Sequence, residues 1–269
     1  MDDIYPRPRF GAPREPVEPK NPGSGLVRVV DFAMRSHTRA VALLVLAGLL
    51  FFLPGFFNIP PVDRDEARFA QATKQMVESN DFIDIRFQDE VRYKKPVSIY
   101  WAQAVVVDTA SALGLPRAQV RIWLYRIPSL IGAIGAVLLT YWTALAFVTR
   151  RGAFLAGLLM CSSILLGVEA RLAKTDAMLL LATTAVMGAM ARAYLSWQRG
   201  DDAPQSWLLA GVFWTAIAWG ILLKGPLILM FVALTVIALA IMDRSAAWLW
   251  RLRPVWGLIW TLVLVLPWF

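Results

Sequence analysis

Two acids and an arginine lie close together in the most polar stretch of this chain, residues 60–101. Asp65, Glu66 and Arg68 fall within four positions, after a charge-free apolar run. A carboxylate beside an arginine can stay ionised and accept a proton from a nucleophile, while the arginine binds an anionic group. The motif therefore indicates acid–base chemistry on an anionic substrate. The alternative is that the acids only cap a surface helix, whose dipole favours negative charge at its N-terminus.

Two further motifs sit between apolar runs. Arg171 and Asp176 belong to the sequence RLAKTD, and a charge-free run follows Asp176 directly. Acids near the hydrocarbon core are costly and usually serve a function, so Asp176 is a candidate site residue. Arg171 has an alternative explanation, because a long cationic side chain at a helix end can reach the interface. Lys224 interrupts two other apolar runs, where a plain helix-breaking hairpin would explain Gly225 and Pro226 but not the lysine.

The first motif is positioned by an element that periodicity predicts. Hydrophobic groups recur at helical spacing between Asp65 and Ser79, at Phe69, Thr73 (through its methyl group), Met76 and Val77. This spacing predicts an amphipathic helix at a membrane surface, with the acids at its N-terminus. The polar stretch is then closed by Tyr93, Lys94, Lys95 and Pro96.

Composition indicates a helical membrane protein. Hydrophobic residues make up 58% of the chain, and the mean hydropathy of +0.56 is far above that of soluble proteins. Seven charge-free stretches can be read, at 40–58, 127–149, 152–168, 177–191, 206–223, 225–242 and 254–269. Several reach the roughly 20 residues needed to cross a membrane, and the others can include flanking residues. We therefore predict an all-α, polytopic membrane protein whose large first extracytoplasmic loop contains amphipathic helices.

The positions of the basic residues predict the topology, because cytoplasmic loops are rich in Lys and Arg. Residues 150–151, 198–202 and 243–253 are assigned to the cytoplasm, as is a disordered N-terminal tail of residues 1–39. These assignments agree only if 97–115, weakened by Asp108, is re-entrant or lies on the surface. The predicted spans are 40–58, 127–149, 152–170, 177–196, 206–223, 226–242 and 254–269. The outer face then carries Asp65, Lys95, Asp176, Lys224 and Trp268.

Charge and cysteine content exclude two other classes of protein. The net charge of +8 is explained by the cytoplasmic loops, and no basic patch interleaved with aromatic residues predicts a nucleic-acid partner. The single cysteine, Cys161, lies in an apolar run, which excludes a disulfide framework and a metal–thiolate site.

Four motifs, taken in order, resemble the lipid-linked-sugar glycosyltransferases of the GT-C class. They read PPVDRDEARFAQATKQM, YKKPVSIYW, RLAKTDAMLL and LLKGP. The resemblance is strongest to the branch of bacterial aminoarabinose transferases and protein O-mannosyltransferase-like enzymes. It implies a GT-C-like bundle and a single transmembrane glycosyltransferase domain over residues 40–269. Members of this family continue for about as many residues again, so we expect the chain to correspond to their N-terminal half.

The resemblance also implies a reaction, namely transfer of a hexose or pentose, with inversion, from a polyprenyl-phosphate donor. The acceptor would be lipid A, a protein or another glycan, reached from the periplasmic side of the bacterial inner membrane among membrane lipids. Asp65 would be the general base, with Glu66 beside it and Asp176 as the second acid. The implied substrate-binding residues are Arg68, Tyr93, Lys94, Lys95, Arg171 and Lys224.

One departure from the family concerns a metal. The family often has Glu-Lys-Pro-Pro where this chain has Lys94, Lys95, Pro96 and Val97. Because Lys94 replaces a carboxylate that binds metal in some members, we predict no metal-binding residues here. A divalent cation stays open as a cofactor.

Two other classes of function stay open at this point. A secondary transporter could use Asp65 and Asp176 as a proton relay, although transporters place such acids in mid-membrane and show internal repeats. We find no repeat, and both acids border predicted spans. A non-catalytic, truncated membrane protein is the other alternative.

Overall fold

The described part of the protein, residues 25–200 and 206–269 of a computed structural model, is almost entirely helical. Its helices and strands are α1 (Gly25–Met34), α2 (His37–Phe52), α3 (Arg64–Ser79), β1 (Arg86–Phe87), β2 (Glu90–Val91), α4 (Ser98–Ala112), α5 (Ile122–Ala144), α6 (Arg150–Cys161), α7 (Ile164–Glu169), α8 (Asp176–Gln198), α9 (Trp207–Lys224), α10 (Leu227–Asp243) and α11 (Pro254–Val265). Short 3-10 turns lie at Ala118–Val120, Ala247–Leu252 and Leu266–Trp268. The expectations for residues 1–24, and for 201–202 within 198–202, lie outside the described residues.

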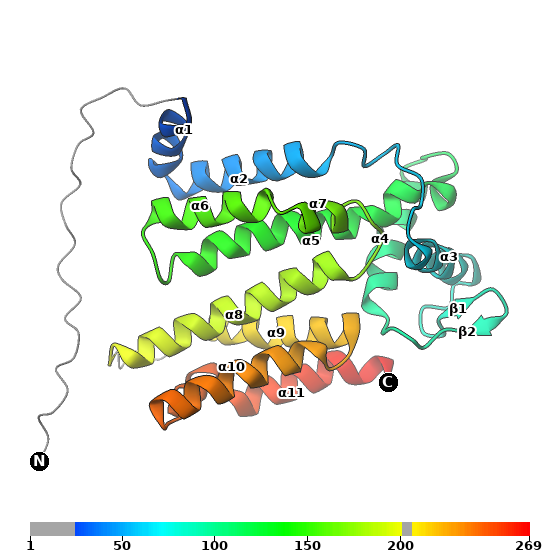
Figure 1. Ribbon diagram of the computed structural model, residues 1–269. Helices are drawn as coiled ribbons and strands as arrows, with labels where there is room; N and C mark the ends of the chain where they lie inside the picture. The colour runs from blue at the N-terminus through cyan, green and yellow to red at the C-terminus, as the bar shows by residue number, and fades with distance from the viewer. Residues whose placement is uncertain (1–24, 201–205) are drawn as a thin grey trace, which may run out of the picture.

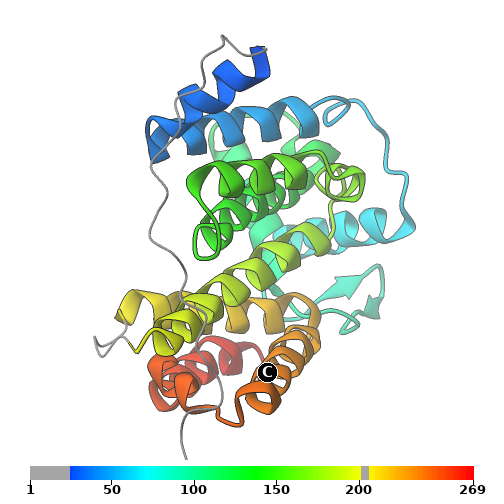
Figure 2. The same ribbon diagram turned by 60° about the vertical axis from the view of Figure 1, so that its left-hand side comes forward.

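The long helices form a bundle, and the segment between α2 and α5 lies at one end of it (Figure 1). Helices α2, α5, α6 and α8 to α11 run side by side, and α3, α4 and the β1–β2 hairpin lie together at one end (Figure 1). We call this the α3 end and the opposite one the α1 end. In the turned view, α8 lies between a half containing α2, α5 and α6 and a half containing α9 to α11 (Figure 2). The predicted all-α bundle is confirmed.

The predicted spans agree with the helices in part. Helices α5, α8 and α9 are long and apolar enough to cross a membrane, whereas α2, α10 and residues 254–268 are apolar but shorter. The predicted span 152–170 is broken, because α6 ends at Cys161 and α7 begins at Ile164. Ser163 sits at the break, where its hydroxyl accepts a hydrogen bond from the Leu166 amide and caps α7.

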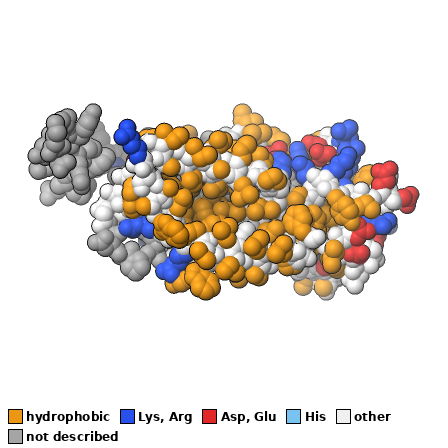
Figure 3. Space-filling model, turned by 90° about the horizontal axis from the view of Figure 1, so that it is seen from below, with side chains coloured by type: hydrophobic (Ala, Val, Ile, Leu, Met, Phe, Trp, Pro, Cys, Tyr) orange, Lys and Arg blue, Asp and Glu red, His pale blue; other side chains and the backbone are white. Residues whose placement is uncertain are grey.

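Exposed hydrophobic side chains of α2, α6, α10 and α11 form an apolar belt between the two ends of the bundle. On the face in Figure 3, hydrophobic side chains cover the middle, Lys and Arg alone mark the α1 end, and both signs of charge gather at the α3 end. Such a belt suits contact with lipid, because most of the charge lies at its two borders.

Helix α4 occupies most of the ambiguous segment 97–115 and lies across the α3 end, not along the bundle (Figure 1). It is not among the apolar helices that could span a membrane. Its Gln103 is fully buried, accepts a hydrogen bond from Thr73 of α3 at 2.7 Å and donates one to the Tyr125 carbonyl of α5 at 3.2 Å. These bonds fix α3 and α4 to the start of α5.

The expected disordered tail of residues 1–39 is helical over its last part, where α1 and the start of α2 lie. Asp31 of α1 forms an ion pair with Arg151, and the Met34 carbonyl accepts a hydrogen bond from Arg150 at 2.8 Å. The His37 ring, which a tail would leave solvated, instead contacts the Tyr141 hydroxyl at 2.8 Å. The arginine side chains at the start of α6 thus hold residues 25–39 against the bundle through an ion pair and a hydrogen bond.

Gly132 lets α5 approach α8 where α8 begins. A Cβ added at this glycine would lie 2.8 Å from the Met178 amide nitrogen and 2.9 Å from the Ala177 carbonyl carbon. Both atoms are helix backbone, which cannot move aside as a flexible side chain can. The close approach fixes the first turn of α8, and with it Asp176.

We predict that Gly132→Ala lowers the stability of the protein by about 1–3 kcal/mol, because the added methyl group overpacks a backbone contact. Thermal unfolding in detergent micelles measures this effect. The matched control is Gly211→Ala in α9, where an added Cβ meets nothing within 4 Å. Removing a helical glycine there should be neutral or stabilising. Equal melting temperatures for the two variants would show that the contact between α5 and α8 tolerates separation.

Candidate active site

The N-terminus of α3 is capped by Asp63, so the two acids that follow it are not needed as caps. The Asp63 carboxylate accepts a hydrogen bond from the Asp65 amide at 2.7 Å. This bond, and then the Lys174 ammonium, hold the pKa of Asp63 below its usual range. The Asp65 side chain is 49% exposed and lies 3.6 Å from Arg68. A carboxylate beside an arginine is therefore present and open to solvent.

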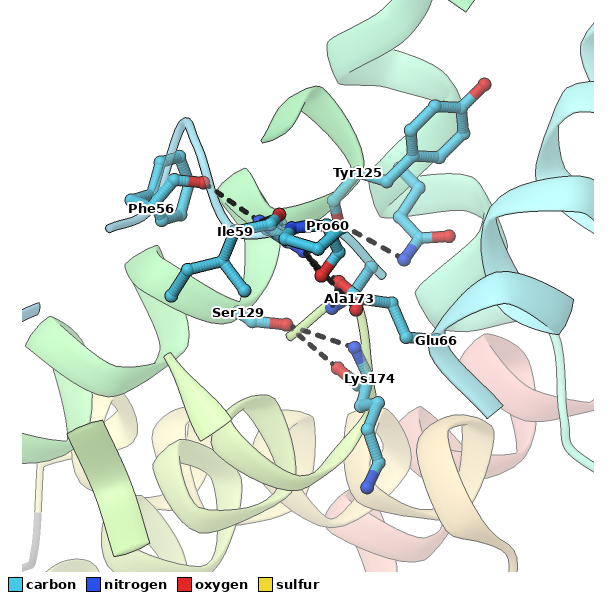
Figure 4. Close-up of polar contacts among 10 residues, drawn as sticks. Phe56, Ile59, Pro60, Glu66, Tyr125, Ser129, Ala173 and Lys174 are labelled. Atoms are coloured by element: carbon cyan, nitrogen blue, oxygen red, sulfur yellow. Dashed lines mark hydrogen bonds and ion pairs between the residues drawn. The ribbon is translucent and has the colours of Figure 1, made fainter. Parts of the chain in front are cut away.

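Glu66 points the other way, into the protein. Its side chain and that of Arg126 in α5 are fully buried, with the Arg126 Nε donating to Glu66 at 2.7 Å and the Nη2 at 3.3 Å. The Glu66 Oε1 also accepts a hydrogen bond from the Ala173 amide at 3.1 Å. Figure 4 shows Glu66 facing Ala173, with Phe56, Ile59 and Pro60 on the other side of the cluster. The predicted acidic pair is thus divided between an exposed and a buried carboxylate.

The segment between α7 and α8 carries the second group of charges. The Lys174 ammonium lies 3.0 Å from Asp63 and 3.8 Å from Glu169. Its own backbone is held by Ser129 of α5, whose hydroxyl donates to the Lys174 carbonyl at 3.0 Å (Figure 4). Lys174 therefore links the cap of α3 to the end of α7.

Asp176 and Lys224 form an ion pair between the first turn of α8 and the last turn of α9. Their side chains are 34% and 24% exposed, so both still reach solvent. Gly225 follows with φ +67°, a conformation that favours glycine and ends α9 after the lysine. Two motifs separated by 48 positions are thus brought together at the α3 end.

The remaining predicted site residues are placed less centrally. Arg171 donates to the carbonyls of Pro54, Gly167 and Phe51, so its guanidinium ties the end of α2 to α7. Tyr93 is exposed and donates to Asp84 at 2.8 Å beside the hairpin. Lys94 is exposed and Lys95 half-buried, and within 25–200 and 206–269 neither forms an ion pair or hydrogen bond. Trp268 packs near Val265 at the end of the described chain.

No group of three His, Cys, Asp or Glu side chains that could hold a metal occurs in the part of the chain that the structure describes. The nearby acids are instead paired with cations, as in Asp63 with Lys174 and Asp176 with Lys224. A divalent cation does not fit this arrangement, so we derive no step through one.

Four residues of this site were not predicted from the sequence, namely Asp63, Arg126, Glu169 and Lys174. Two of them had a usable signal, because Arg126 directly precedes the charge-free run 127–149 and Glu169 directly follows 152–168. Charged residues at the borders of apolar runs are candidates for function or for pairing. The Glu169 Oε2 is buried without a hydrogen-bond partner among the described residues.

Comparisons with known proteins give one family model and several relatives. Residues 94–269 match the family model described as dolichyl-phosphate-mannose-protein mannosyltransferase. Among curated proteins, the undecaprenyl phosphate-alpha-4-amino-4-deoxy-L-arabinose arabinosyl transferase of Aeromonas salmonicida is 28% identical over 226 residues, covering 82% of this chain and 38% of the relative. Its counterpart in Pectobacterium carotovorum is 27% identical over 233 residues, covering 86% and 39%.

Solved structures show the same fold. The crystal structure of ArnT from Cupriavidus metallidurans in the apo state matches with a TM-score of 0.72 and 21% identity, covering 87% of this chain and 41% of that one. The same protein bound to undecaprenyl phosphate matches with a TM-score of 0.71 and 22% identity, with the same coverage. The chain therefore spans about two fifths of the length of the proteins that it resembles.

We predict that Arg126→Met lowers the free energy of unfolding by about 3–5 kcal/mol, because it leaves the Glu66 carboxylate buried without its cation. Adding Glu66→Leu to Arg126→Met should restore only part of the loss, because it removes the unpaired carboxylate but leaves the Ala173 amide and three backbone carbonyls without their partners. Unfolding in detergent, followed for both variants, gives the comparison. A double variant no more stable than the single one would contradict this account of the pair.

Proposed function

We propose a function from one premise, that the chain belongs to the dolichyl-phosphate-mannose-protein mannosyltransferase family. The protein transfers a sugar, a hexose or a pentose, from a polyprenyl-phosphate donor to lipid A, a protein or another glycan. The observation that carries the proposal is the contact of Asp176 with Lys224 at the α3 end. Two residues before Asp176, Lys174 binds Asp63, the N-cap of α3. A donor whose lipid tail lies along the apolar belt would bring its phosphate to this border.

Lys224 supplies the charge that the leaving group needs. As the bond between the anomeric carbon and the phosphate oxygen breaks, negative charge grows on the departing polyprenyl phosphate. A partly desolvated ammonium stabilises that charge more strongly than water does. In the structure Lys224 is paired with Asp176, so the carboxylate holds the ammonium in place until the phosphate shares it.

Asp65 acts as the general base. It takes the proton from an acceptor hydroxyl while the hydroxyl oxygen forms a bond to the anomeric carbon, and polyprenyl phosphate leaves from the opposite side with inversion. Its exposed carboxylate suits direct contact with an acceptor, and the Arg68 guanidinium lies 3.6 Å from it.

The other predicted residues divide by their surroundings. Lys94, Lys95 and Tyr93 follow the hairpin and lie at the α3 end, where we propose that they contact the donor phosphate and sugar. We leave Arg171 out of the phosphate site, because its donors are already bound to three carbonyl groups. Because the Glu66 side chain is fully buried, we propose that it supports the site and does not touch the substrate.

We also propose that the α3 end is periplasmic and the α1 end cytoplasmic in a bacterial inner membrane. Basic side chains dominate the α1 end, as the positive-inside rule requires. They include Arg35, Arg39, Arg150, Arg151, Arg192, Arg199, Arg244, Arg251 and Arg253. The charges of the α3 end are instead of both signs (Figure 3).

The transporter alternative lacks a supporting observation. Asp65 and Asp176 lie in the first turns of α3 and α8, at the border of the bundle and not at its middle. Membership of a glycosyltransferase family favours transfer over a proton relay.

We predict that Asp65→Asn lowers sugar transfer by about 10²–10⁴-fold, because asparagine keeps the shape but cannot take a proton. Membranes containing the protein would be assayed with a radiolabelled sugar on undecaprenyl phosphate. Asp89→Asn, which changes an exposed acid in the hairpin turn, is the matched control and should retain activity. Normal transfer by the Asp65 variant would remove it from the role of base.

We predict that a cysteine at Ser111, in α4, reacts with an impermeant thiol reagent added outside intact cells. A cysteine replacing Arg151 should stay protected until the membrane is opened, because adjacent arginines resist translocation. Both positions are exposed on the protein, and Cys161 would first be changed to Ala. The reverse labelling pattern would mean that the α3 end faces the cytoplasm.

A further inference from the structure

We propose that Glu66 and Arg126 are positioning residues, which hold the two acids of the site at a fixed separation. The inference rests on the proposed function, since it assigns Asp65 and Asp176 to one reaction. Neither residue touches the substrate, and both meet at one atom, the Glu66 Oε1. The Glu66 Oε1 accepts hydrogen bonds from Arg126 in α5 and from the Ala173 amide before α8.

Three segments that carry or support the site meet at this atom. Glu66 directly follows Asp65 in α3, and Ala173 precedes Asp176 by three residues. A shift of the Glu66 carboxylate therefore moves the start of α3 relative to the start of α8. Figure 4 shows the Glu66 side chain lying between α3 and the segment that holds Ala173 and Lys174.

Arg126 extends the same restraint to the segment that leads into α3. Its Nη1 donates to the carbonyls of Phe56 at 3.0 Å and Ile59 at 2.8 Å, and its Nη2 donates to Pro60 at 3.3 Å. One buried guanidinium thus donates hydrogen bonds to three backbone carbonyls and a carboxylate. Without it, these carbonyls would need water as their hydrogen-bond donor. The path of residues 56–63 and the position of Asp65 both depend on it.

The geometry requires arginine and not only a positive charge. A lysine carries one ammonium with three donors, and it cannot reach the carboxylate and carbonyls on both sides in the way that a planar fork does. Arg126→Lys therefore tests position at constant charge. Glu66→Gln tests charge at constant shape. The glutamine amide has an NH₂ donor in place of one carboxylate oxygen, so it cannot accept all the hydrogen bonds that Glu66 accepts from Arg126 and Ala173.

The experiment measures position and chemistry separately. Spin labels at Ala67→Cys in α3 and Val168→Cys in α7, both exposed, report the distance between the two segments in a Cys161→Ala background. We expect one narrow distance distribution in the parent, and a broader or shifted one in Glu66→Gln and in Arg126→Lys. Arg151→Met, at the opposite end, is the control and should leave the distribution unchanged.

Transfer kinetics form the second readout. Misplacing the base by about 1 Å should lower kcat by about 100-fold in both variants, while the KM for the undecaprenyl-phosphate donor changes less than kcat. Unchanged distance distributions in both variants would overturn the inference, whatever the activity. A rise in KM with kcat retained would also overturn it, because the pair would then act in donor binding. Altered distances in the variants, together with a parent that transfers no sugar, would refute the proposed function and leave the restraint standing.

Discussion

The buried ion pair of Glu66 with Arg126 is the interaction on which the α3 end depends, because it joins α3, α5, the segment before α8 and the loop that leads into α3. Both charges are fully buried, so each is costly unless the other is present and the remaining hydrogen bonds are made. They are made here, by Ala173 and by the carbonyls of residues 56, 59 and 60. A long polar loop is thereby fixed to a bundle that is otherwise held by apolar packing.

Exposure separates support from chemistry across the site. The side chains of Glu66 and Arg126 are fully buried. The ion pair of Asp176 with Lys224 is a quarter to a third exposed, and the Asp65 side chain is about half exposed. Charges that only support a fold can be completely buried when they are paired, whereas the proposed base and the proposed phosphate-binding lysine must meet substrate. Gly132 contributes to the same arrangement, because its missing side chain sets how closely α5 approaches the first turn of α8.

Much of this could be predicted from the sequence, since apolar runs and helical spacing depend on local patterns. The α3 helix, the bundle and the convergence of Asp176 with Lys224 on one end followed from such patterns. The role of Glu66 could not, because Asp65 and Glu66 are chemically alike and only the fold turns one inward. The pairing of Arg126 with Glu66 could not be predicted either, because the two residues lie 60 positions apart in the chain. Residues 25–39 contact Arg150 and Arg151, and local composition does not report these long-range contacts.

The most direct test of the central claim is the binding of undecaprenyl phosphate, compared with undecaprenol, to the purified protein. If the α3 end holds a polyprenyl phosphate, the phosphate should bind more tightly than the alcohol. Lys224→Ala should reduce that preference by about tenfold or more, the value of a charge-assisted hydrogen bond. Lys74→Ala, which removes a charge paired with Glu78 on α3, should leave it unchanged. Equal binding of the two lipids, or a preference that survives Lys224→Ala in full, would contradict the account.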